Sequence, residues 1–241
     1  MNIDAFSPLT LEAIQAHAAK DFPNEACGLI IVRKGRERYV ACKNIANSGD
    51  HFVMSREDFS KAEDEGEILA IVHSHPNVAA RPSEADLVGC EATNVPWLII
   101  SWPTGLMSLT VPTGYKAPLI GRSYAHGILD CYSLCRDYYK ETLGLDLPDY
   151  ERDDFWWLKG QDMYLDNFQA AGFSRVPNKD LKLHDGILMQ VSSKVPNHAA
   201  IYIGDGLILH HVQGRLSSRD VYGGYWQKNT YCVVRHESQK C

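Results

Sequence analysis

The clearest hydrophobic run in the first half of the chain covers residues 67–72, Glu-Ile-Leu-Ala-Ile-Val, and polar residues follow it at once. An apolar run of this length with polar ends is typical of a buried strand. Two helices are predicted before it, and the second begins with Ser55 and Asp58 as a capping pair. The predicted helices are residues 9–20 and 55–65, and the further predicted strands are 27–33, 38–42, 95–102 and 106–111. The first half is therefore predicted to be a mixed α/β domain.

The second half has a different pattern, in which helices come first and strands follow. Residues 127–139 predict a turn that runs into an amphipathic helix, and residues 161–171 predict another. Two short apolar stretches, 198–203 and 207–210, flank the sequence Gly204-Asp205-Gly206, which is a strong hairpin signal. Further strands are predicted at residues 187–191 and 230–235. This order predicts a domain of the α+β type.

Prolines and a glycine cluster in residues 112–118, between the last strand of the first half and the helix of the second. We therefore predict a first domain over 1–111, a linker over 112–122 and a second domain over 123–241. A length of 241 residues suits two domains of just over a hundred residues, each large enough for a core of its own.

Composition and charge exclude several classes of function. Hydrophobic residues make up 45% of the chain and charged residues 22%, as is usual for globular proteins. The formal net charge of -6, without a basic run or a phosphate-binding glycine loop, argues against a nucleic-acid partner. The start of the chain lacks a secretory signal, and no apolar stretch is long enough to span a membrane. We expect a cytoplasmic chain, no membrane insertion, and free thiols for the seven cysteines.

Potential metal ligands gather around the end of the strand that covers residues 67–72. His73 and His75 are two residues apart, so their side chains lie on the same face of that strand. Ser83 is a predicted helix cap with Asp86 in the first turn. A lone His-x-His is more often accidental, and a capped helix is ordinary. Together they place three ligands with a fourth position open, as in a catalytic zinc site, and Glu25 is the best candidate for the general base.

This pattern resembles the JAMM motif of the JAB/MPN metalloproteases, and residues 25–29 resemble the glutamate-bearing segment of their prokaryotic members. The resemblance covers roughly residues 1–111 and implies a JAB/MPN-like fold. It also implies one Zn²⁺ per chain, held by His73, His75 and Asp86 with a water molecule. Glu25 would be the general acid and base, and Ser83 would stabilise the oxyanion. Members of that family cut peptide or isopeptide bonds.

A second group of reactive side chains lies in the second half. Asp130 is a predicted helix cap, and Cys131 then occupies the first helical position, where the helix dipole favours a thiolate. Cys135, one turn further on, is predicted to pack in the core. His198 opens the first strand of the predicted hairpin and His210 ends the second, so the hairpin can bring both imidazoles together. Cysteine catalysis needs such a base and a third group that orients it.

Other interpretations of this region remain open. Taken alone, an Asp-Cys pair is more often an ordinary buried cysteine. His126 is a minor rival for the base, and His211 is predicted to face away from the site. The aromatic segment 150–157 can stack on sugars, but packing under a loop is the favoured prediction. Residues 223–226 can line a cleft, but an ordinary turn is favoured.

The second half resembles the NlpC-type papain-like peptidases of bacterial cell-wall metabolism. The resemblance rests on the Asp-Cys helix start, the later strand that opens with histidine, the third polar residue after the hairpin, and residues 184–189. It implies a papain-like α+β fold with Cys131 as nucleophile, His198 as base and His210 as its orienting partner. Members hydrolyse amide bonds in peptidoglycan stem peptides, often between D-glutamate and the diamino acid. Two departures, the compressed segment 124–127 and Tyr132 in place of a serine, bear on which bond is cut.

A JAMM half followed by an NlpC-type half is similar to the tail-tip assembly proteins of lambda-like phages, over essentially all 241 residues. This resemblance implies a role in phage tail assembly in the host cytoplasm, with other tail-tip proteins as partners. Peptidoglycan is a candidate substrate, and the virion tail tip is a second candidate location. The alternative is a structural docking factor that keeps the peptidase folds without needing their chemistry.

Overall fold

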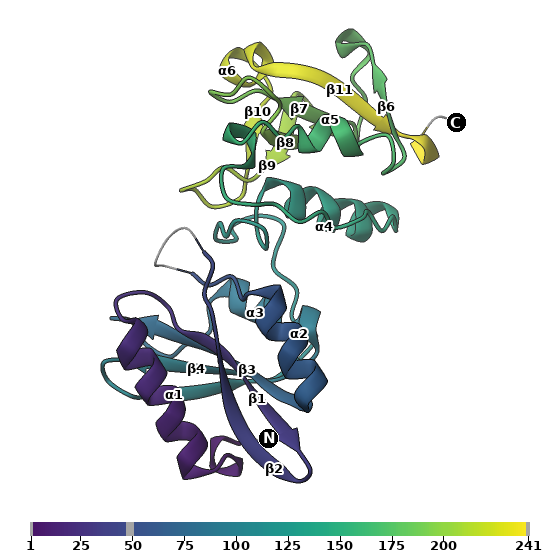
Figure 1. Ribbon diagram of the computed structural model, residues 1–241. Coiled ribbons are helices and arrows are strands. Elements are labelled where there is room, and N and C mark those ends of the chain that lie inside the picture. Colours follow the sequence, from purple (N-terminus) through teal and green to yellow (C-terminus); the bar gives the residue numbers. More distant parts are fainter. Residues whose placement is uncertain (1, 47–50, 240–241) are drawn as a thin grey trace. The chain divides into compact units, whose positions relative to one another are not determined.

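The computed structural model of the protein describes residues 2–46 and 51–239. The chain divides into two compact units, Met1–Lys116 and Ala117–Cys241, and this division falls inside the predicted linker. Both units combine helices with one sheet (Figure 1). No helix among the described residues is long and apolar enough to cross a membrane. The six described cysteines are free thiols, and Cys241 lies outside the described residues.

The first unit is built on a five-stranded sheet in the order β2-β1-β3-β4-β5. β3 and β4 pair in parallel and the other neighbours are antiparallel. Its elements are the 3₁₀ helix η1 (Ile3–Ala5), α1 (Pro8–Asp21), β1 (Cys27–Arg33), β2 (Arg36–Cys42), α2 (Arg56–Glu65), β3 (Glu67–Pro76), α3 (Glu84–Thr93), β4 (Trp97–Trp102) and β5 (Met107–Thr110). The predicted capping pair of α2 is confirmed, because the Ser55 side chain accepts a hydrogen bond from the Asp58 amide.

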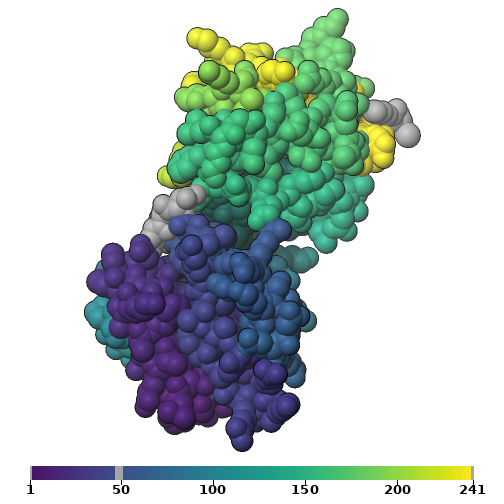
Figure 2. All heavy atoms as spheres, in the orientation of Figure 1, coloured from purple at the N-terminus to yellow at the C-terminus, as the bar shows by residue number. Residues whose placement is uncertain are grey.

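Helices cover both faces of this sheet, because buried apolar side chains alternate along its strands. Ile14 of α1 packs in one cluster with Ile30 of β1. Leu29, the neighbour of Ile30, faces the other way and packs with Ala62 of α2 and Cys90 of α3. Figure 1 shows α1 separated from α2 and α3 by the sheet, and Figure 2 shows the side chains of the purple and blue segments filling the face in view. β3 is therefore central and enclosed.

The second unit holds a six-stranded antiparallel sheet in the order β10-β9-β8-β7-β11-β6. Leu134 and Tyr138 of its longest helix pack against Ile201 and Leu209 of the sheet. Its elements are α4 (Cys131–Leu143), η2 (Trp156–Leu158), α5 (Met163–Asn167), β6 (Phe173–Val176), η3 (Asn178–Asp180), β7 (Gly186–Met189), β8 (His198–Gly204), β9 (Leu207–His210), β10 (Ser218–Val221), α6 (Gly224–Lys228), β11 (Thr230–His236) and η4 (Glu237–Gln239).

The predicted hairpin is confirmed, since β8 and β9 pair on either side of Gly204-Asp205-Gly206. All three turn residues have positive φ, which glycine and aspartate tolerate better than most residues. The predicted helix over 161–171 is wrong in extent, because α5 ends at Asn167 and the chain turns at Gly172, with φ +84, to enter β6. β6 and β10 were not predicted, since both are four-residue edge strands with polar residues.

Candidate metal and cysteine centres

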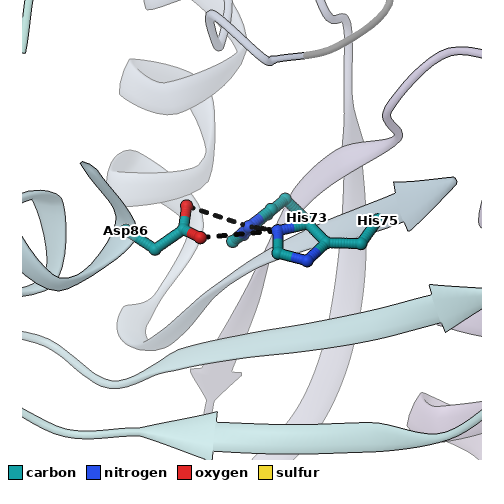
Figure 3. A group of neighbouring side chains, drawn as sticks. All are labelled: His73, His75 and Asp86. Atoms are coloured by element: carbon teal, nitrogen blue, oxygen red, sulfur yellow. Dashed lines mark hydrogen bonds and ion pairs between the residues drawn. The ribbon is translucent and has the colours of Figure 1, made fainter. Parts of the chain in front are cut away.

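Three predicted ligands of the first unit meet at one point. His73 and His75 both lie on β3, and Asp86 lies in the first turn of α3. The Nε2 atoms of the two histidines are 3.0 Å apart. Oδ1 of Asp86 lies 3.2 Å from Nε2 of His73, and Oδ2 lies 3.4 Å from Nε2 of His75. Figure 3 shows the carboxylate pointing at both imidazoles, so the three side chains offer a triangle of ligand atoms.

The size of this triangle fits a zinc ion. Two ligand atoms that are each about 2.0–2.1 Å from a tetrahedral zinc lie about 3.4 Å from one another. The two imidazole nitrogens are 3.0 Å apart, and each lies 3.2 Å or 3.4 Å from a different oxygen of Asp86. With one ligand atom per residue, all three atoms lie within 4.8 Å of one another. Two imidazoles and one carboxylate also form a donor set that zinc accepts. Within the described ranges, this is the one such group of three histidine, cysteine or acidic side chains.

Neighbouring groups fix the direction of each ligand. Nδ1 of His75 lies 3.1 Å from the carbonyl oxygen of Ala79 and donates to it, which leaves the lone pair on Nε2. Asp86 and Ser83 form a capping box at the start of α3. The Ser83 amide donates to Oδ2 of Asp86 over 2.7 Å, and Oγ of Ser83 accepts from the Asp86 amide over 3.1 Å. The hydroxyl proton of Ser83 can therefore be donated to another acceptor.

The charges of the three side chains depend on one another. Burial alone would raise the pKa of Asp86, but its hydrogen bonds with His73 and His75 outweigh burial and hold that pKa well below its usual range. Burial lowers the pKa of His73, although Asp86 opposes this. Burial also opposes protonation of His75, but Asp86 and the Ala79 carbonyl raise its pKa overall. An ionised carboxylate beside a neutral His73 is the state in which these groups bind metals.

Glu25 lies beside this triangle, in the residues that lead into β1. Cys27 pairs with His73 in the β1–β3 register, and the Ser74 amide donates to the Ala26 carbonyl over 2.9 Å. Glu25 is therefore opposite His75, and its charge helps to raise the pKa of that histidine. The carboxylate side chain is buried and lines a cavity of about 850 Å³ that also includes Asn44. The structure thus places the predicted general base next to the predicted ligands.

In the second unit, Cys131 is the first residue of α4, as predicted. The helix cap is also as predicted, because the Asp130 carboxylate accepts from the Ser133 amide over 2.8 Å. Sγ of Cys131 lies 3.3 Å from the hydroxyl of Tyr164 and accepts a hydrogen bond from the backbone of Ala199, the residue after His198. Cys131 and His198 line the same cavity of about 280 Å³.

The β8–β9 hairpin brings the two predicted histidines into contact. Nε2 of His198 lies 3.0 Å from Nδ1 of His210, and both rings are buried. Trp226 of α6 covers them, with its ring 4.5 Å from the His210 ring at an angle of 90°. The structure therefore gathers Cys131, His198 and His210 around the hairpin.

One further residue of this group, Asp220, is not predicted from the sequence. Oδ2 of Asp220 lies 3.1 Å from Nε2 of His210. Asp220 belongs to β10, in which Ser218 pairs with His210, so the aspartate is its diagonal neighbour across the strands. The only sequence signal would have been the alternation of residues 218–221, and it is too short to predict a strand.

Electrostatics changes the expected state of the cysteine. Burial and the Asp130 charge raise the pKa of Cys131 to about 11, although its position at the helix start favours a thiolate. Burial, followed by the charges of His210 and His211, lowers the pKa of His198 to about 3. Both groups are therefore neutral at pH 7. Desolvation outweighs the helix dipole here, because Cys131 is only 9% exposed.

The cavity walls correct several predictions. Trp156 is buried against Trp157 and Tyr164, in line with the predicted packing, and both tryptophans also line the cavity. Trp226 lines it from the predicted turn, which is the short helix α6. His211 also lines the cavity instead of facing away. His126 is held through Nε2, which lies 3.1 Å and 3.0 Å from two backbone carbonyl oxygens. That nitrogen is engaged as a donor, and His126 also lines the cavity.

Family models match the two units separately. The family model described as prokaryotic homologs of the JAB domain matches residues 9–111, and that of the NlpC/P60 family matches residues 121–235. Among solved structures, an NlpC/P60 family protein from Bacillus cereus is 12% identical and has a TM-score of 0.37. The match covers 92% of this chain and 66% of that chain.

Two curated relatives match the chain across both units. The tail tip assembly protein K of Escherichia phage N15 is 41% identical over 231 residues, which cover 95% of this chain and 94% of the relative. The tail tip assembly protein K of Escherichia phage lambda is 43% identical over 185 residues, or 77% of this chain and 90% of the relative.

Proposed function

This chain belongs to the family of the phage tail tip assembly proteins K, with a JAB domain followed by an NlpC/P60 domain, and on that premise we propose that it serves tail tip assembly as a hydrolase with two centres. Its partners are other tail tip proteins, which it meets in the host cytoplasm while the tail is built. One centre depends on zinc and the other on a cysteine.

In the first centre, His73, His75 and Asp86 would hold a zinc ion. When bound, the ion would supply Lewis-acid chemistry and would make a water molecule more acidic. Glu25 takes a proton from the attacking water and passes it to the leaving nitrogen of a peptide or isopeptide bond. The Ser83 hydroxyl, whose oxygen already accepts from the Asp86 amide, donates its proton as a hydrogen bond to the carbonyl oxygen of the substrate.

In the second centre, Cys131 attacks the carbonyl carbon of an amide through Sγ. Because thiol and imidazole are neutral, the thiol proton moves to His198 as the carbon–sulfur bond forms. His198 then gives that proton to the leaving nitrogen, and water hydrolyses the thioester. His210 holds the His198 ring through the 3.0 Å hydrogen bond. The substrate is a peptidoglycan stem peptide, and the tryptophans of the cavity wall suit the sugar rings that carry it.

The observation that carries this proposal is the convergence of polar side chains at two buried points, three ligand atoms in one unit and the His198–His210 pair beside Cys131 in the other. Burying such polar groups is unfavourable for folding, and a docking surface does not require it. Keeping the catalytic side chains would serve no purpose in a pure docking factor.

Complementation distinguishes a hydrolase from a docking factor that needs no catalysis. A phage that lacks this gene would be supplied with the wild type, Cys131→Ser, Asp86→Asn, or both substitutions. The control is Cys135→Ser, which alters a buried thiol one helical turn further on and outside the cavity. We expect a loss of infectious particles with Cys131→Ser but not with Cys135→Ser. Normal yields from the doubly substituted protein would refute a hydrolytic role in infection and leave the docking role.

A further inference from the structure

We infer that Asp220 is a positioning residue that sets the tautomers of His210 and His198, and thereby leaves Nδ1 of His198 free to take the proton of Cys131. This inference rests on the proposed cysteine-peptidase function. It adds a fourth member to the group of Cys131, His198 and His210, at the far end from the sulfur.

The three side chains that carry the inference follow one another across three neighbouring strands. His198 is a diagonal neighbour of His210, because Ala200 pairs with His210 in the β8–β9 register. Asp220 is the diagonal neighbour on the other side, because Ser218 pairs with His210 in the β9–β10 register. His210 thus lies between them, with Nδ1 3.0 Å from His198 and Nε2 3.1 Å from Asp220.

The protons of this row follow from the carboxylate at its end. Asp220 is ionised, because hydrogen bonds and charge from His210, Ser218 and Arg215 lower its pKa despite some burial. An ionised carboxylate only accepts hydrogen bonds, so its oxygen at 3.1 Å favours the proton on Nε2 of His210. Burial lowers the pKa of His210 and keeps the ring neutral, which leaves Nδ1 without a proton. His198 must then donate from Nε2, and its Nδ1 holds a free lone pair.

The opposite arrangement would disable the base. If His210 carried its proton on Nδ1, it would donate to Nε2 of His198, and the proton of a neutral His198 would sit on Nδ1. That nitrogen could then not accept the thiol proton. The two arrangements make the same hydrogen bond between the rings, so the contact between the histidines does not choose between them. Asp220 makes the choice.

The surroundings strengthen this effect. The His210 side chain is 0% exposed, and the Trp226 ring lies edge-on against it. In such a water-poor place, hydrogen bonds to a charged group are stronger than in water. Asp220 is itself held by the Ser218 hydroxyl over 3.1 Å and by the Arg215 guanidinium over 3.3 Å. Its carboxylate is therefore fixed toward His210 although 22% of the side chain is exposed.

A double-substitution cycle on the full chain tests the inference. His210→Gln replaces the imidazole by an amide whose oxygen can accept from Nε2 of His198 without help from Asp220. We expect Asp220→Ala to lower kcat for stem-peptide hydrolysis by about 100-fold in the wild-type background, since a wrong tautomer costs that much or more in comparable triads, with little change in KM. In the His210→Gln background, the same substitution should change kcat by less than about twofold. Arg219→Ala is the control, because it removes an exposed side chain of β10 beside Asp220.

A second readout does not need catalysis. Long-range proton–nitrogen NMR of histidine-labelled protein should show His198 and His210 both protonated on Nε2 in the wild type and in Arg219→Ala. Asp220→Ala should move a proton of His210 to Nδ1. An inactive wild type with these tautomers would contradict the proposed peptidase activity but not the role of Asp220 in setting the tautomers. Unchanged tautomers in a folded Asp220→Ala protein, or an equal loss of kcat in both backgrounds, would overturn the inference itself.

Discussion

Nε2 of His198 lies 3.0 Å from Nδ1 of His210, across a hairpin whose turn is Gly204-Asp205-Gly206. The two residues are twelve positions apart, and the turn with its positive φ angles fixes how the strands pair. A shift of the pairing by one residue would send one imidazole to the opposite face of the sheet. The contact is therefore a direct product of the turn sequence.

Zinc content tests the ligand triangle of the first unit. We expect purified wild type to carry about one zinc per chain, and Asp86→Ala to lose it, because two imidazoles alone leave the site without its carboxylate. Asp64→Ala, which removes an exposed acid of α2, is the matched control and should keep the metal. The measurement is elemental analysis by mass spectrometry. A metal-free wild type prepared with zinc present would contradict the proposed site.

Alkylation of Cys131 tests its protonation state. With a thiol pKa raised to about 11 by burial, the rate of reaction with iodoacetamide should stay low at pH 7 and keep rising beyond pH 9. Peptide mass spectrometry would follow the modification of Cys131 over a series of pH values. An inflection below pH 7 would mean a thiolate paired with a protonated His198. It would show that the helix dipole outweighs burial in setting the pKa of Cys131.

Acid should destabilise the second unit through its buried histidines. Burial lowers the pKa of His198 to about 3 and that of His211 to about 4, both from 6.5. Between those values and 6.5 the unfolded chain binds more protons than the folded one, so stability falls as the pH falls through this window. Thermal melts at pH 7 and pH 4.5 should show a larger loss of Tm for wild type than for His198→Gln. An identical loss in both proteins would contradict the assignment.

Arg152 should be important for the stability of the cysteine site. Its Nε lies 2.7 Å from Oδ2 of Asp130, and its Nη2 donates to the Gly127 carbonyl over 2.8 Å. Both charged side chains are at most 6% exposed, so Arg152→Ala would leave a buried carboxylate unpaired. We expect a loss of about 3–5 kcal/mol in urea unfolding. Lys140→Ala removes an exposed ion pair with Asp146 and should cost less than about 1 kcal/mol. Equal effects of the two substitutions would be inconsistent with this role.

Most of the architecture was predictable from sequence, because it follows from local rules. The two-domain order, a JAB domain and then an NlpC/P60 domain, was predicted from motifs and is confirmed. The strand that leads to His73, the cap at Asp130 and the hairpin after His198 each depend on a few neighbouring residues. Such signals are contained in the sequence itself.

What the sequence did not reveal depends on long-range packing. Asp220 reaches His210 only because β10 joins the edge of the sheet, and a short polar strand has no pattern that predicts its partner. Trp156 and Trp226 line the cavity because of how loops fold over it. The raised pKa of Cys131 likewise comes from burial, which a helix position cannot reveal.

The most direct test of two separate hydrolytic centres is the digestion of host-type peptidoglycan, with released fragments identified by mass spectrometry. Wild type, Cys131→Ala and Glu25→Ala would be compared at equal concentration. We expect wild type and Glu25→Ala to release the same stem-peptide fragments, and Cys131→Ala to release none. Fragments that persist with Cys131→Ala, or no release by the wild type, would contradict a cell-wall peptidase centred on Cys131.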